Sequence, residues 1–140
     1  MIAAERARGV AASRIVLAGF SQGGVIALHT GLRHAERLAG IVGLSTYLVD
    51  PASLAAEASD ANRVVPILLA HGLRDPVIRY EWAEASRTAL EKGDTPFTPG
   101  ISLVLATHAA ASLMTKEGRE NVFARHARHA GPCGLAGRLG

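Results

Sequence analysis

Three short apolar runs, separated by helix-forming stretches, constrain the fold of this 140-residue chain more than any other feature. They cover residues 14–19, 40–45 and 65–70, and Arg14 is the only charged residue in them. Short apolar runs of this kind are typical of strands buried on both faces of a sheet. Helical patterns follow at residues 23–32 and 80–92. The order predicts an α/β fold, with three parallel strands and flanking helices on both faces of the sheet.

Polar residues that suit hydrolysis follow these strands. Ligand chemistry in a parallel sheet gathers at the carboxyl ends of the strands. The residues directly after the three runs are 20–22, 46–47 and 71–75, and they include Ser21 and Asp75. A serine at one strand end and an aspartate at another is what nucleophilic hydrolysis requires.

Ser21 lies in a recognisable sequence motif. Residues 19–24, Gly-Phe-Ser-Gln-Gly-Gly, fit the pattern G-x-S-x-G between a strand and a helix. We expect Ser21 to occupy a strained turn, in which side chains at position 19 or 23 would clash with neighbouring backbone. The Gln22 N–H, at the positive end of the helix, could then stabilise an oxyanion. The alternative is a glycine-rich turn without a chemical role.

Asp75 follows the third run through His71 and Gly72. An acid that orients a catalytic histidine needs such a rigid place close to the top of the sheet. The alternative is that the Asp75-Pro76 pair only initiates a turn, as Asp-Pro often does.

Residues 3–92 resemble the carboxylesterase, phospholipase and acyl-protein thioesterase family of α/β-hydrolases. The resemblance rests on residues 13–24, 38–45, 66–72 and 75–78. It implies a partial α/β-hydrolase fold, with Ser21 as the nucleophile, Asp75 as the triad acid and the Gln22 N–H as half of the oxyanion hole. The implied substrate is a small acyl ester or thioester, hydrolysed without a cofactor or metal.

The chain departs from this family in two places. The family's upstream strands and second oxyanion N–H have no counterpart before residue 14, so we expect a truncated form that is weakly active or inactive. The strand at 14–19 would then present an open apolar edge, through which the chain could self-associate. A non-catalytic remnant that acts only by association is therefore the alternative function.

The second departure follows Lys92. Residues 93–130 resemble a segment of class V aminotransferases, on the strength of residues 92–99, 101–103, 117–118 and 120–126. This resemblance implies helices at 102–116 and 121–129, and hence a helical segment at 93–140 of different origin from a hydrolase domain at 1–92. It carries over no cofactor site, and an aminotransferase-like fragment remains a further alternative.

The general base is the least constrained part of the site. His108 follows Asp75 by 33 residues, which suits the order of a triad. A helix at 102–116 would carry His108 away from the strand ends, whereas a strand at 101–106 would leave it just past one. Five other histidines compete for the role, with surface or turn positions as the alternative for each: His29, His34, His71, His126 and His129.

Composition excludes several classes of partner. A formal charge of +3 without a basic stripe, and only 4% aromatic residues, argue against nucleic acid. Residues 99–115, within the longest uncharged run (95–115), are too few and too polar to span a membrane. The chain has one cysteine, Cys133, which rules out an internal disulfide and any multi-cysteine zinc site. Glu5, Arg6 and Arg8 interrupt the apolar core that a signal peptide needs, so we expect a cytoplasmic protein.

Overall fold

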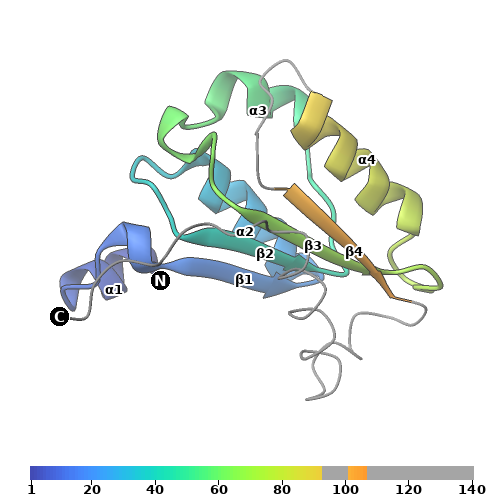
Figure 1. The fold of residues 1–140 in the computed structure, drawn as a ribbon, viewed down its shortest axis with the longest axis horizontal. Helices are drawn as coiled ribbons and strands as arrows, with labels where there is room; N and C mark the ends of the chain where they lie inside the picture. Colours follow the sequence, from blue (N-terminus) through green and yellow to red (C-terminus); the bar gives the residue numbers. More distant parts are fainter. Residues whose placement is uncertain (93–100, 107–140) are drawn as a thin grey trace, which may run out of the picture. The chain divides into compact units, whose positions relative to one another are not determined.

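A four-stranded parallel sheet organises the computed structural model, which describes residues 1–92 and 101–106 (Figure 1). The strands lie in the order β1-β2-β3-β4, and all described elements belong to one compact unit, Met1–Ala110. Two short 3₁₀ turns, Ala12–Arg14 and Asp60–Asn62, complete the connections. The elements in chain order are α1 (Ile2–Ala7), β1 (Val16–Phe20), α2 (Gln22–Arg33), β2 (Gly40–Leu44), α3 (Pro51–Glu57), β3 (Ile67–Gly72), α4 (Tyr80–Lys92) and β4 (Ile101–Ala106).

The three predicted strands are confirmed, and β4 is a fourth. It pairs with β3 in parallel, from Ile67 opposite Ile101 to Gly72 opposite Ala106. The helix expected to begin at Ser102 is therefore wrong over residues 102–106, where the alternative strand is correct. An isolated run of Ile, Leu and Val fits either structure, and pairing with β3 decides between them. The remainder of that helix and the one at 121–129 lie outside the described residues.

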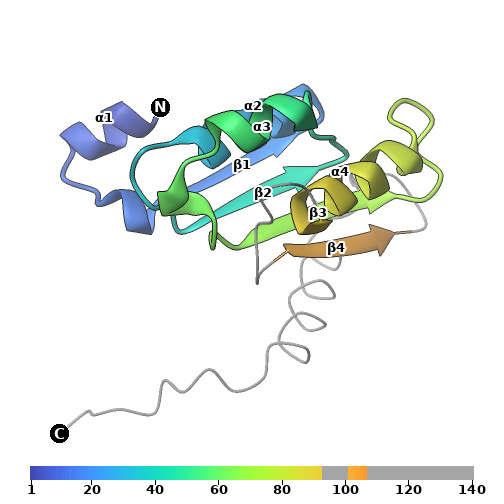
Figure 2. The same cartoon turned by 90° about the horizontal axis from the view of Figure 1, so that it is seen from above.

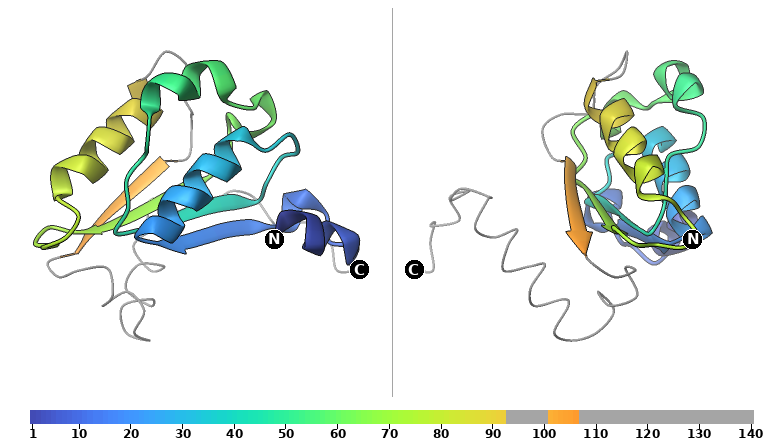
Figure 3. Two further views of the ribbon diagram at one scale, coloured as in Figure 1. Left: turned by 180° about the vertical axis from the view of Figure 1, so that it is seen from behind. Right: turned by 90° about the vertical axis from the view of Figure 1, so that its right-hand side faces the viewer.

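The described helices α2, α3 and α4 lie over the same face of the sheet (Figure 2; Figure 3). On the opposite face of β1, Val16 and Phe20 are 53% and 51% exposed, whereas Leu17 packs beneath α2. The prediction that this strand is buried on both faces is thus wrong. As expected, β1 is an edge of the described sheet and pairs only with β2.

The core fixes α2 closely against the sheet. Leu28 and Leu32 of α2 are fully buried, together with Ile41 and Leu69 of the strands beneath them. A Cβ atom at Gly31 would lie 2.6 Å from the Cδ1 atom of Ile41, so α2 approaches the sheet closely at this glycine. The N-terminus of α2 is thereby held at the carboxyl end of β1. None of the helices within residues 1–92 has the length and apolar character needed to cross a membrane.

Candidate active site

Ser21 occupies the turn between β1 and α2 in a conformation that few residues other than glycine adopt. Its φ is 52° and its ψ is −121°. Such a backbone is strained and persists only where the surrounding structure enforces it. The Ser21 N–H donates to the Leu44 carbonyl oxygen at 2.8 Å, which fastens the turn to the end of β2. The strained turn predicted around Ser21 is therefore present.

The glycines around Ser21 differ in what they permit. A Cβ atom at Gly19 would lie 2.1 Å from the backbone carbon and oxygen of Gly23, so the predicted clash at position 19 is confirmed. The clash predicted at Gly23 is wrong, because a Cβ atom there would have open space within 4 Å. The second crowded position is Gly24, whose added Cβ would lie 2.7 Å from the Thr46 Cβ atom.

The peptide that joins Ser21 to Gln22 is held at its carbonyl oxygen, by α2 and by Thr46. The Ser21 carbonyl oxygen accepts from the N–H groups of Gly24 (3.0 Å) and Val25 (3.2 Å) and from the Thr46 hydroxyl (2.8 Å). Gln22 is the first residue of α2, where N–H groups have no acceptor within the helix. This geometry leaves the Gln22 N–H suited to receive an oxyanion.

Asp75 follows β3 in a turn that it stabilises itself. Its Oδ1 atom accepts from the N–H groups of Val77 (2.9 Å) and Ile78 (3.0 Å), and its own N–H donates to Gly72 (3.2 Å). The turn-forming role that we kept as an alternative is therefore real. It does not exclude a catalytic role, because an ionised carboxylate has further acceptor positions.

Opposing influences set the charge of Asp75. Burial is the largest single influence and raises the pKa of this carboxyl, whereas hydrogen bonds from the Ile78 and Val77 N–H groups lower it. A hydrogen bond from Ser45 and the electrostatic attraction of His71 lower it further. The net pKa lies below the ordinary value of an aspartate, so Asp75 is held as an anion, as the orienting acid of a triad must be.

Ser45 and Thr46, which directly follow β2, connect the serine to the aspartate. Ser45 is buried at φ 44° and hydrogen-bonds the Asp75 side chain, while Thr46 donates to the Ser21 carbonyl. The sequence identified residues 46–47 as lying at a strand end but assigned them no role. The structure therefore brings Ser21 and Asp75 to the same edge of the sheet, the one formed by the carboxyl ends of the strands. They lie on either side of the Ser45-Thr46 dipeptide.

His71 anchors the loop that carries Asp75. It is 1% exposed, and its Nε2 atom forms a 2.8 Å hydrogen bond with the Ile78 carbonyl oxygen. Because a carbonyl can only accept, Nε2 carries the hydrogen in this contact. Its Nδ1 atom has no partner among residues 1–92 and 101–106. His71 lies within β3, and the expectation that it is a turn residue is therefore wrong; its buried ring instead holds the turn that follows the strand.

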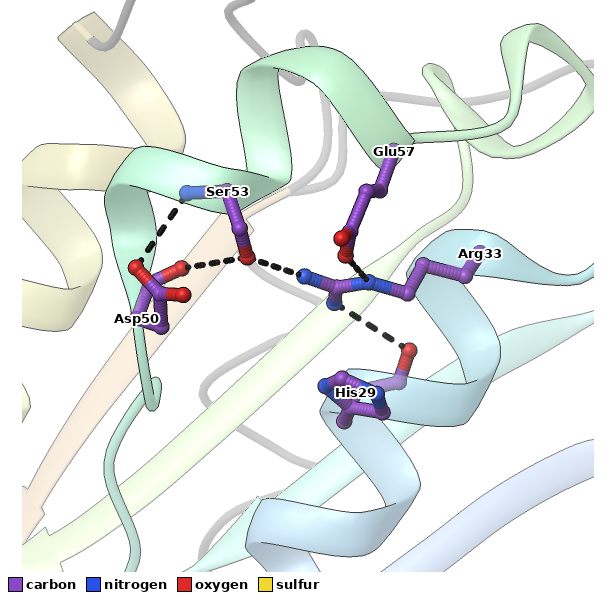
Figure 4. Close-up of polar contacts among 5 residues, drawn as sticks. All are labelled: His29, Arg33, Asp50, Ser53 and Glu57. Carbon is purple, nitrogen blue, oxygen red and sulfur yellow. Dashed lines mark hydrogen bonds and ion pairs between the residues drawn. The ribbon is translucent and has the colours of Figure 1, made fainter.

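Arg33, rather than a histidine ring, joins α2 to α3. Figure 4 shows His29 beside Arg33, which binds Glu57 (2.6 Å) and the Ser53 hydroxyl (2.9 Å), while the Asp50 side chain caps α3 by accepting from the Ser53 N–H. The carbonyl of His29, rather than its ring, accepts from Arg33 at 3.4 Å. His29 is exposed, as expected, and His34 ends the helix in a partly buried position. His108, His126, His129 and Cys133 lie outside the described residues.

The chain has extensive similarity to known hydrolases. The sequence profile of the family described as Phospholipase/Carboxylesterase matches residues 1–96. Acyl-protein thioesterase 1 of Yarrowia lipolytica is 41% identical over 87 residues, which are 62% of this chain and 38% of that protein. Acyl-protein thioesterase 1 homolog 2 of Dictyostelium discoideum is 31% identical over 118 residues, 84% of this chain and 52% of that protein.

The fold agrees with these similarities. The crystal structure of esterase PE8 matches with a TM-score of 0.71 and 27% identity, over 91% of this chain and 56% of that one. The chain thus spans about half or less of the length of these relatives. The resemblance of residues 93–130 to class V aminotransferases has no support in these matches.

Proposed function

The chain belongs to the phospholipase/carboxylesterase family, and on this basis we propose that it is a serine hydrolase of acyl esters or thioesters. One observation carries the proposal. Ser21 stands in a strained strand-to-helix turn, connected through Ser45 and Thr46 to the anionic Asp75 at the same sheet edge. The thioester option is supported by the relatives named acyl-protein thioesterase.

The proposed reaction is acyl transfer to water. The Ser21 Oγ atom attacks the carbonyl carbon while a histidine takes its proton, and the Gln22 N–H binds the resulting oxyanion. The histidine then protonates the leaving alcohol or thiol as its bond breaks. Water, deprotonated by the same histidine, releases the acid and restores Ser21. Asp75 holds that histidine in the correct orientation throughout.

We propose His108 as this base. Ala106, the last residue of β4, lies in register with Gly72, which begins the turn to Asp75, and His108 follows two residues later. A catalytic histidine just past a strand end suits the order Ser, Asp, His of this fold. An alignment that covers 84% of a 140-residue chain also includes His108 wherever it begins, so the Dictyostelium relative supports a hydrolase origin for this stretch.

Weak activity or inactivity stays a prediction of the sequence. Loss of one oxyanion donor costs about 10²- to 10³-fold in kcat in serine hydrolases, so the kcat of the chain measures whether the Gln22 N–H acts together with a second donor.

Hydrolysis of p-nitrophenyl acetate and of an acetyl thioester tests the proposal. We expect activity above background in the wild type, its loss in Ser21→Ala, and its loss in His108→Ala. His29→Ala is the matched control, since His29 lies exposed on α2, and it should retain full activity. Wild-type activity that survives Ser21→Ala would contradict the proposed nucleophile. Activity that is lost in Ser21→Ala but retained in His108→Ala would contradict His108 as the base and leave Ser21 as the nucleophile.

A second candidate function is association without catalysis. The exposed side chains of β1 and its outer edge, which is unpaired within residues 1–92 and 101–106, favour it, because an open apolar strand edge is a template for another chain. Ester hydrolysis dependent on Ser21 would exclude this as the sole function. A cytoplasmic location and the absence of a nucleic-acid partner stay predictions of the sequence.

A further inference from the structure

Thr46 contacts the nucleophile turn from outside it. Its hydroxyl donates to the Ser21 carbonyl oxygen at 2.8 Å. The other two donors to this oxygen, the N–H groups of Gly24 and Val25, belong to the first turn of α2. Thr46 is therefore the side chain that ties the Ser21–Gln22 peptide to β2, independently of the helix.

We propose that Thr46 is a positioning residue that aims the Gln22 N–H at the oxyanion, an inference that rests on the proposed function. A trans peptide is planar, so the Ser21 carbonyl and the Gln22 N–H point in opposite directions. A hydroxyl that fixes the carbonyl on one side consequently fixes the direction of the N–H on the other. Thr46 acts through this peptide and has no contact with substrate in the mechanism.

Thr46 is itself rigidly placed. It is 3% exposed, and the preceding Ser45 N–H donates to the Ala70 carbonyl oxygen at 2.8 Å, which joins it to β3. Its Cγ2 methyl occupies the space that a Cβ atom at Gly24 or Gly43 would need, at 2.8 and 2.7 Å respectively. A β-branched side chain packed on both glycines has little rotamer freedom. The hydroxyl is thus a fixed donor, as an oxyanion hole prepared before reaction requires.

Three substitutions separate the hydroxyl from the packing. Thr46→Ser keeps the hydroxyl and loses the methyl, Thr46→Val does the reverse, and Thr46→Ala loses both. Thr46→Ala also controls for the crowding that a methyl group would meet near the Ser21 oxygen in Thr46→Val. If the hydroxyl matters, the serine variant retains function and the other two lose it to a similar degree.

The first readout is the rate at which a fluorophosphonate modifies Ser21. In this reaction the Oγ–P bond forms, the P–F bond breaks, fluoride leaves and the base takes the serine proton. Misdirecting an oxyanion donor should slow the reaction less than removing it, so we expect about tenfold slower modification of Ser21 in Thr46→Val and Thr46→Ala. In Thr46→Ser we expect a rate close to that of the wild type. Equal rates in all four proteins, or a loss in Thr46→Ser equal to that in Thr46→Ala, would overturn the proposal.

The second readout requires no activity. The carbonyl ¹³C resonance of Ser21, observed through the Gln22 amide, reports hydrogen bonding to the Ser21 oxygen. We expect it to shift in Thr46→Val and Thr46→Ala and to stay in place in Thr46→Ser. An unlabelled wild type would count against the proposed function, whereas an unshifted carbonyl resonance in Thr46→Ala would overturn the role of Thr46 itself.

Discussion

At the scale of single residues, we expect alanine substitution of two glycines four positions apart to have opposite effects on the stability of the fold. We expect Gly19→Ala to destabilise the fold by about 3 kcal/mol or more, since its methyl would meet Gly23 backbone that cannot move aside. Gly23→Ala, in open space within α2, should be neutral or stabilising by up to about 1 kcal/mol through helix propensity. Urea unfolding measures both. Equal effects of the two substitutions would contradict the described turn.

The lowered pKa of Asp75 predicts that the stability of the fold depends on pH. Its pKa is lowered in the folded chain, so the unfolded chain binds its proton more readily. The stabilisation from this carboxylate is therefore fully present above the ordinary aspartate pKa of about 3.9 and is lost as pH falls through the lower folded value. Asp75→Asn keeps an acceptor for the turn but cannot ionise, and it should lose this part of the dependence.

The measurement is the free energy of unfolding of both proteins as a function of pH. Other acids, including Glu84 with its own lowered pKa, are common to both and cancel in the difference. The wild type should gain stability relative to Asp75→Asn as pH rises through the range around and below 4. A constant difference across that range would show that the Asp75 pKa is not lowered by folding.

Features of single residues could be predicted from the sequence where a short motif by itself determines the local backbone geometry. The strained Ser21 turn and the requirement for Gly19 both follow from G-x-S-x-G between a strand and a helix. The free space at Gly23 and the roles of Ser45 and Thr46 do not, because they depend on how β2 lies against α2. That contact joins residues more than 20 positions apart, and no local pattern encodes it.

At the scale of elements, Asn62 joins the connection between α2 and β2 to the 3₁₀ turn before β3. It is fully buried and accepts from the Leu38 N–H (2.8 Å), while its amide donates to the carbonyls of His34 (2.7 Å) and Glu36 (3.0 Å). Asn62→Leu would leave these groups unpaired, at about 1–3 kcal/mol for each one that stays buried. We expect a loss of about 3 kcal/mol in urea unfolding.

Glu57→Gln provides the contrast at the same scale. It weakens the ion pair between α2 and α3, but the Glu57 side chain is 53% exposed. An exposed pair contributes at most about 1 kcal/mol, so the loss should be small. A larger loss of unfolding free energy in Glu57→Gln than in Asn62→Leu would contradict the larger contribution that we expect from the buried Asn62 contacts.

Elements were predictable where pattern and length agree. The first three strands and the helices α2 and α4 follow from apolar runs and helical periods. The error at β4 arose because the resemblance to an aminotransferase segment implied a helix. The side chains of Ile101, Leu103, Val104 and Leu105 also suit a strand, and the choice depends on pairing with the edge of β3 that β2 leaves free. The error at β1 has a similar cause, since an apolar run alone does not reveal whether both faces are covered.

At the scale of the whole molecule, the exposed face and edge of β1 predict self-association. Val16→Lys places a charge on that face and should shift the chain toward monomers in analytical ultracentrifugation, because like charges oppose pairing of strand edges. Thr88→Lys adds the same charge to the exposed surface of α4 and should leave the oligomeric state unchanged. A wild type that is monomeric at all concentrations would contradict the prediction.

The central claim is that the sheet edge holding Ser21, Asp75 and the Gln22 N–H activates Ser21 as a nucleophile. Mass spectrometry of the chain after reaction with a fluorophosphonate tests it most directly. We predict a single adduct on the peptide that contains Ser21, absent from Ser21→Ala and strongly reduced in Asp75→Asn. An unmodified wild-type chain, or an adduct that persists in Ser21→Ala, would contradict it.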